Sequence, residues 1–101
     1  MTPPTAGPPP GPAPPTIPVR IPTPLRSYTG AAVVQAAGRT LDELLVDLDR
    51  RHPGIRFRMV DEQGRLRRHI MIFVERERCR DLARDLAGVD EVTIMQALSG
   101  G

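Results

Sequence analysis

The feature that most constrains the fold is one amphipathic helix, predicted over residues 40–52. The spacing of Thr40 and Glu43 predicts a capping box at its start, and Pro53-Gly54 is expected to end it. Its apolar residues follow the i, i+3, i+4, i+7 spacing and make a single stripe: Leu41, Leu44, Leu45 and Leu48. The fold must therefore supply an apolar surface that buries this one stripe.

A hairpin is predicted before the helix. Apolar residues alternate with proline and arginine over 17–21, as in a strand with one buried face. The prolines there require an edge or strand-end position, or the loss of ladder hydrogen bonds where they sit. Residues 24–30 are typical of a turn, and 31–36 predict the second strand.

Further strands are predicted after the helix. Residues 55–60 alternate like a strand but also fit a short helical turn, which we prefer, and 61–64 form a turn. The apolar run 70–74 predicts a central strand, 79–82 a short edge strand and 92–98 the last strand. The order hairpin, helix, strands predicts an α+β domain in which one helix covers one face of a mixed sheet.

The first sixteen residues differ in composition from the rest. Residues 1–16 hold eight of the twelve prolines and no large apolar residue after Met1. We expect a disordered tail with polyproline II bias, acting as a spacer and being neither a signal peptide nor a membrane anchor. The domain is then expected over 17–97, with a flexible tail over 98–101.

Charge and residue types argue against several functions. The fourteen basic residues are all arginine and are interleaved with twelve acidic ones, for a net charge of +2, so no one-sided basic face for nucleic acid is evident. No metal-ligand spacing or catalytic set is recognisable, and we expect no bound metal. The single cysteine, Cys79, excludes an internal disulfide, fits a reducing cytoplasm and is interpreted as incidental.

The printed sequence ends in Gly100-Gly101. Two residues without a Cβ can pass through a narrow channel in a partner, and residues 98–101 can extend roughly 13 Å. The pattern is typical of a C-terminal carboxylate presented on a slim tail, although two final glycines also occur as fraying ends or as the scar of an expression tag.

This order of elements with a terminal Gly-Gly resembles the β-grasp, ubiquitin-like sulfur carrier proteins. These include the thiamine-pathway carrier, the small subunit of molybdopterin synthase and the cysteine-biosynthesis carrier of actinobacteria, and the last is the most similar. The matching segments are Arg20–Gly30, Thr40–Leu45, Leu48-Asp49, Arg51–Arg56, Val60–Glu62, Val92–Ile94 and Gly100-Gly101. The resemblance covers residues 17–101 and implies a mixed sheet of four to five strands under one main helix. The proline tail and an arginine-rich segment, 75–86, are departures from it.

The resemblance also implies a mechanism. A ubiquitin-activating-like adenylyltransferase and sulfurtransferase would join the Gly101 carboxylate to AMP, using ATP, and a sulfur donor would convert the anhydride to a thiocarboxylate. Leu98, Ser99 and Gly100 would form the tail that enters the partner. The sulfur would pass to an acceptor enzyme that is cysteine synthase-like or belongs to a natural-product pathway. The chain would be a cytoplasmic cosubstrate, monomeric when free, with no bound cofactor and no catalytic residues of its own.

Three other functions fit the same terminus. The chain could be the small subunit of molybdopterin synthase, held in a stable complex. It could be a ubiquitin-like modifier joined through Gly101 to target lysines; it has no lysine of its own for self-chains. It could also be an interaction module with an inert tail.

Strand alternation predicts where partners bind. If Val92 and Ile94 face the core, Met95 faces outward, and the same alternation turns Met71 and Phe73 outward. Met71, Phe73 and Met95 would then form an exposed apolar patch, which suits a carrier that binds an activator and then an acceptor. The alternative is that Met71 or Phe73 packs in the core.

Overall fold

The computed structural model describes residues 14–97. Most of the predicted proline tail and all of the predicted 98–101 tail lie outside the described residues. The elements in chain order are β1 (Ile17–Arg20), a 3-10 turn η1 (Thr23–Leu25), α1 (Arg26–Thr29), β2 (Val33–Ala36), α2 (Leu41–Arg51), α3 (Ile55–Met59), β3 (Ile70–Val74), β4 (Glu77–Cys79) and β5 (Val92–Gln96).

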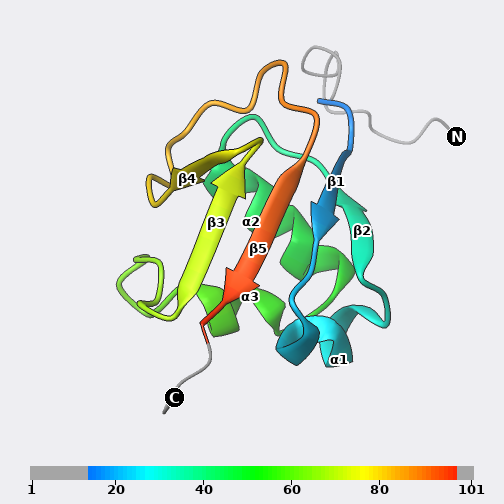
Figure 1. Ribbon diagram of the computed structural model, residues 1–101, viewed down its shortest axis with the longest axis vertical. Coiled ribbons are helices and arrows are strands. Elements are labelled where there is room, and N and C mark those ends of the chain that lie inside the picture. The colour runs from blue at the N-terminus through cyan, green and yellow to red at the C-terminus, as the bar shows by residue number, and fades with distance from the viewer. Residues whose placement is uncertain (1–13, 98–101) are drawn as a thin grey trace, which may run out of the picture.

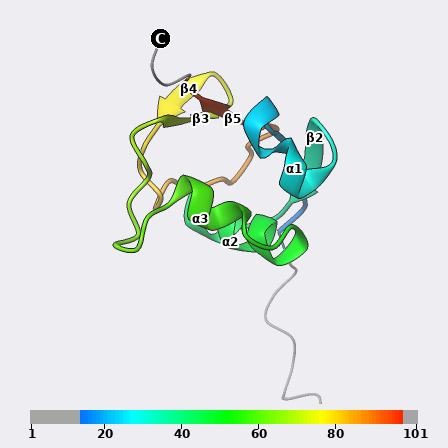
Figure 2. The ribbon, with the colours of Figure 1, turned by 90° about the horizontal axis from the view of Figure 1, so that it is seen from below.

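The strands form one mixed sheet in the order β2-β1-β5-β3-β4 (Figure 1). β1 pairs parallel with β5, and the other pairs are antiparallel. α2 and α3 cover one face, and the other face carries no helix layer (Figure 2). This is the β-grasp arrangement, with five strands and α2 as the main helix, that the resemblance implied.

The predicted helix is confirmed, and its stripe is the centre of the core. Leu41, Leu44, Leu45 and Leu48 are fully buried. The Thr40 hydroxyl accepts a hydrogen bond from the Glu43 N–H at 3.2 Å. The Glu43 carboxylate accepts from the Arg39 N–H instead of the Thr40 N–H expected in a capping box. No polar or charged residue between positions 14 and 97 is buried.

Asp47, in the second half of α2, connects this helix to the residue that follows β2. Its carboxylate accepts a hydrogen bond from the Ala37 N–H at 2.8 Å and forms ion pairs with Arg50 and Arg51. Burial opposes ionisation, but these hydrogen bonds outweigh it and lower the pKa of Asp47 to about 2. The charged carboxylate therefore stabilises the folded state.

The connection between β1 and β2 differs from the prediction. The segment predicted as a simple turn folds as η1 followed by α1. Pro24 supplies a helical φ in the first turn, Leu25 is buried in the core, and Gly30, with φ 71°, closes α1 in the left-handed region. β2 consequently begins at Val33 and not at Ala31. The short helical turn expected over 55–60 is confirmed as α3.

Two strand predictions after the helix need correction. The edge strand lies at Glu77–Cys79, not at residues 79–82, because Glu75 takes a positive φ of 61° and the chain reverses within two residues, pairing Glu77 with Val74. β3 is an interior strand, but the middle of the sheet is β5. β5 ends at Gln96, short of the predicted residue 98.

Candidate functional site

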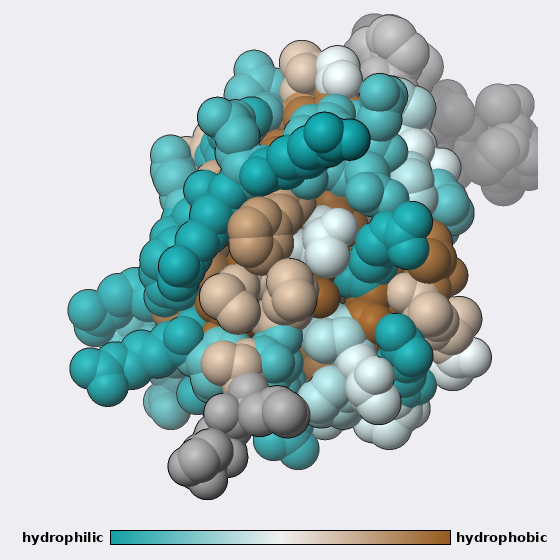
Figure 3. Space-filling view, in the orientation of Figure 1, coloured by the Kyte–Doolittle hydropathy of each residue, from teal (hydrophilic) through white to brown (hydrophobic). Residues whose placement is uncertain are grey.

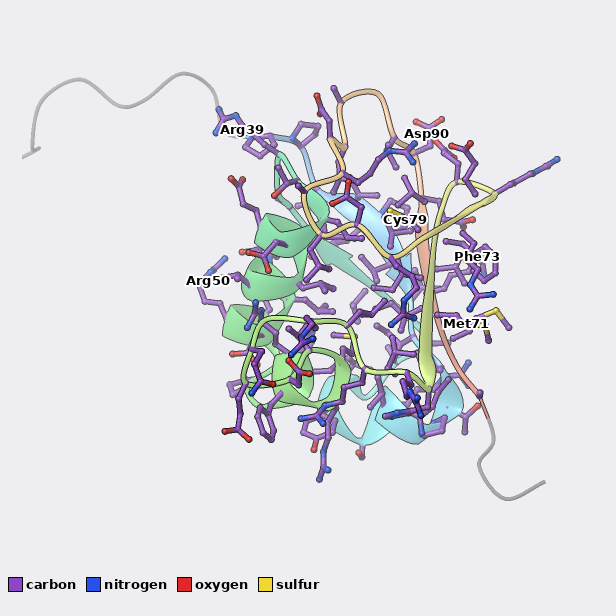
Figure 4. The ribbon with its side chains drawn as sticks, turned by 90° about the vertical axis from the view of Figure 1, so that its left-hand side faces the viewer. Arg39, Arg50, Met71, Phe73, Cys79 and Asp90 are labelled. Atoms are coloured by element: carbon purple, nitrogen blue, oxygen red, sulfur yellow. The ribbon has the colours of Figure 1, made fainter. Side chains whose placement is uncertain are left out.

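The helix-free face of the sheet carries the predicted patch. Met71 lies directly opposite Met95 in the antiparallel pairing of β3 with β5. Met95 is 45% exposed, while Met71 and Phe73 are partly exposed. Figure 4 shows Met71 and Phe73 on the side of β3 away from α2. The predicted strand faces are therefore confirmed, and neither Met71 nor Phe73 packs in the core between sheet and helix.

One row of side chains crosses this face from edge to edge. Thr93 pairs with Phe73 on one side and with Arg20 on the other, and Phe73 pairs in turn with Arg78 on β4. Side chains at directly opposed positions share a face. The Arg20 guanidinium forms an ion pair with the Glu91 carboxylate at 2.8 Å. Sequence reasoning missed both arginines, because their place beside the patch depends on cross-strand register.

A shallow groove adjoins the patch on the β1 side. Its walls come from the end of β1, from η1 and from β5, and include Ile21, Pro22, Pro24, Met95 and Gln96. In the space-filling view, apolar side chains occupy the middle of this face and hydrophilic ones surround it (Figure 3). An apolar centre with a polar rim is typical of a protein contact surface.

The root of the C-terminal tail is fixed at one end of the sheet. The Ala97 N–H donates to the His69 carbonyl oxygen at 2.8 Å, directly after β5 ends. A small polar hollow lies beside this point, with Tyr28, Arg58, His69 and Gln96 in its lining. The Arg58 guanidinium donates to the Tyr28 hydroxyl at 2.6 Å, and this hydrogen bond raises the pKa of Arg58. The hydrogen bond to His69 holds Ala97, the last described residue, at the border of the open face.

The four predicted tail residues, Leu98, Ser99, Gly100 and Gly101, lie outside the described residues. Cys79 is buried in β4, and its thiol donates to the Asp81 carbonyl oxygen at 3.4 Å. The residue belongs to the buried apolar cluster, which agrees with its interpretation as incidental to function. Across residues 14–97, no cluster of three or more His, Cys, Asp or Glu side chains has a metal-binding arrangement. Within the same span, no helix has the length and apolar character needed to cross a bilayer.

Comparison with known proteins agrees with this architecture. The ThiS family model matches residues 19–101. The sulfur carrier protein CysO of Mycobacterium tuberculosis is 40% identical over 89 residues, which cover 82% of this chain and 96% of that protein.

Solved structures give the same result. The crystal structure of Mycobacterium tuberculosis CysO matches with a TM-score of 0.75 and 39% identity, over 81% of this chain and 99% of that one. A BexX/CysO complex from Amycolatopsis orientalis matches with a TM-score of 0.77 and 38% identity, over 84% and 99%. SAMP1 from Haloferax volcanii, at 24% identity and a TM-score of 0.73 over 85% and 99%, shares the fold. With a family model spanning most of its length and a relative at this identity, the chain belongs to the ThiS family of β-grasp sulfur carrier proteins.

Proposed function

We propose that this chain carries sulfur as a thiocarboxylate on Gly101 and delivers it to cysteine biosynthesis or to a sulfur-containing metabolite. The observation that carries the proposal is the 40% identity with CysO over 82% of the chain, on a fold whose last strand ends beside an open apolar face. A relative from Amycolatopsis orientalis forms a complex with BexX, which supports a role in which the folded domain is recognised by a protein partner.

The chemistry needs only the terminal carboxylate of this chain. A carboxylate is a poor electrophile, so an adenylating partner joins it to AMP and releases pyrophosphate from ATP. Sulfide then attacks the acyl carbon and displaces AMP, which leaves the thiocarboxylate. A persulfide donor would instead leave an acyl disulfide, and a second thiol must cleave its S–S bond to release the thiocarboxylate and a disulfide. This sulfur is ionised at neutral pH and is a soft nucleophile. Tethering it to a protein delivers it to one acceptor without release of free sulfide.

The geometry suits separate roles for the folded domain and the tail. Ala97 is anchored to His69, and the four residues after it can extend roughly 13 Å from that anchor. The patch of Met71, Phe73 and Met95 lies on the face that ends at the same border. We infer that the partner binds this face while the tail enters its nucleotide site. The chain is then a cosubstrate, and the partner supplies the catalytic groups.

The test is intact mass spectrometry of the chain after incubation with ATP, sulfide and an adenylating enzyme of the ubiquitin-activating type. Conversion of one carboxylate oxygen to sulfur raises the mass by the difference between the two atoms, whereas a ubiquitin-like modifier gains the mass of a whole target protein. Deleting Gly101 should abolish the mass gain without changing the melting temperature. Retained thiocarboxylation by the deletion variant would refute the proposal.

A further inference from the structure

The run Glu75-Arg76-Glu77-Arg78 alternates in charge and, as a sequence, reads as neutral. Within residues 14–97 of the structure, the acidic side chains of this run have partners and the basic ones do not. The Glu75 carboxylate accepts a hydrogen bond from the Asp90 N–H at 2.7 Å, and the Glu77 carboxylate pairs with Arg84 at 3.3 Å. Both acidic groups are thereby engaged by the 80–91 connection and not by the arginines next to them.

The two arginines of the run are left without partners. The side chains of Arg76 and Arg78 make no hydrogen bond or ion pair within residues 14–97, and both residues are exposed. Arg78 lies directly opposite Phe73, so its side chain stands on the same face as the apolar patch. Arg76 occupies the turn that joins β3 to β4, at the end of the same hairpin. Figure 3 shows hydrophilic side chains bordering the apolar centre along this part of the sheet.

The β1 side of the patch differs from the β4 side in how its arginines are paired. Arg20 faces Thr93 across the β1–β5 pair, but its guanidinium is already neutralised by Glu91 at 2.8 Å. On the same side Arg26 lines the groove, and its guanidinium donates to the Ile21 carbonyl oxygen. The open face therefore has an apolar centre and, on the β4 side, an edge whose two arginines have no side-chain partner within residues 14–97. Charges at the rim of an interface mainly control the association rate and its salt dependence, and they select against partners with the same charge.

We propose that Arg76 and Arg78 dock carboxylates of the partner protein, beside the apolar contact made by Met71, Phe73 and Met95. This inference rests on the proposed function and names the chemistry of the adenylating partner: an apolar surface with acidic residues along one edge. A protein fits better than a nucleic acid. Two free arginines and one aromatic ring provide few of the phosphate contacts and stacking platforms that a polynucleotide site uses.

The experiment compares steady-state thiocarboxylation of the full chain with a matched pair of variants. Arg76→Glu/Arg78→Glu reverses the proposed edge. Arg50→Glu/Arg65→Glu makes the same change in net charge elsewhere, on α2 and in the turn before β3; Figure 4 shows Arg50 on the helix side, far from Met71. The same adenylating enzyme is used with the wild type and with both variants. KM for the chain and kcat are measured by mass spectrometry at about 50 mM and about 300 mM salt.

We expect KM at low salt to rise about tenfold for Arg76→Glu/Arg78→Glu with kcat unchanged, and to change less than about twofold for the control. The KM of the wild type should rise with salt, and that of the edge variant should not. Equal KM values for the wild type and the edge variant, or equal shifts in both variants, would overturn the inference while wild-type conversion upholds the proposed function. Absence of wild-type conversion would overturn the function itself. Binding of a single-stranded oligonucleotide that is lost in the edge variant alone would reassign the edge to nucleic acid.

Discussion

At the scale of single residues, Gly38 shows how closely the chain is packed where β2 leads into α2. The residue is buried, and a Cβ added there would collide with the Leu44 amide nitrogen in the first turn of the helix. The obstacle is backbone, which cannot rotate away as a long side chain can. Nothing in the sequence pattern marks this glycine, because the close approach exists only after α2 has packed.

Replacing Gly38 with alanine should therefore lower the free energy of unfolding by about 3 kcal/mol, as the helix start must shift. Chemical denaturation measures the loss. Gly64→Ala is the control, because Gly64 has φ 77° and no atom lies within 4 Å of the added Cβ. Only backbone strain should then lower its free energy of unfolding, by about 1 kcal/mol. A Gly38→Ala protein as stable as the wild type would contradict the packing described here.

Asp47 gives a prediction for pH dependence. Its pKa of about 2 lies below the usual value of 3.8 for an aspartate, so the charged form stabilises the fold above the unfolded pKa. This stabilisation is lost as pH falls through the folded pKa. Asp47→Asn should cost about 2 kcal/mol at pH 7, and the difference from wild type should fade between about pH 4 and pH 2. Asp90→Asn, whose carboxylate makes no hydrogen bond or ion pair within residues 14–97, should show no such difference at either pH.

At the scale of elements, β5 is the strand on which fold and site both depend. It pairs with β1 on one side and β3 on the other. From Val92 to Met95 its residues alternate between buried and at least partly exposed. Ile94 is 2% exposed and Met95 is 45% exposed. Adjacent residues of one strand thus serve the core and the open face.

Arginine substitutions at these two positions should separate stability from binding. Ile94→Arg places an unpaired charge in the core and should unfold the domain, at a cost above about 4 kcal/mol. Met95→Arg should keep the wild-type melting temperature and weaken binding to the adenylating partner by about tenfold. Thermal melts measure the stability of both variants, and titrations with the adenylating partner measure their affinity. A folded Ile94→Arg beside an unfolded Met95→Arg would mean that the two faces are reversed.

At the scale of the whole molecule, the buried apolar cluster of the described residues extends along the chain from Ile17 to Ile94. We therefore expect deletion of residues 1–13 to leave the melting temperature within about 1 °C of wild type, since that segment offers no large apolar side chain after Met1. A loss of many degrees in a calorimetric scan would instead show that the proline-rich segment contributes to the folded domain.

Local pattern accounts for the parts of the fold that were predicted correctly. The capped leucine stripe is sufficient to predict α2, because helix periodicity and capping depend on residues within a few positions of each other. Alternation alone also separated Met71 and Phe73 from the core, since successive side chains of a strand point to opposite faces. The edge strand was misplaced because its turn contains neither glycine nor asparagine at the position of positive φ, which Glu75 occupies.

Sequence by itself determined one amphipathic helix, the inward and outward faces of the strands, and the family resemblance on which the proposed role of Gly101 rests. Tertiary structure alone decided which residues surround the patch. The parallel pairing of β1 with β5 brings Arg20 beside Thr93, and the β3–β4 hairpin places Arg78 beside Phe73 while Glu77 pairs with Arg84. Local periodicity fixes the face that a side chain occupies, but its neighbours on that face depend on register between strands that are distant in sequence.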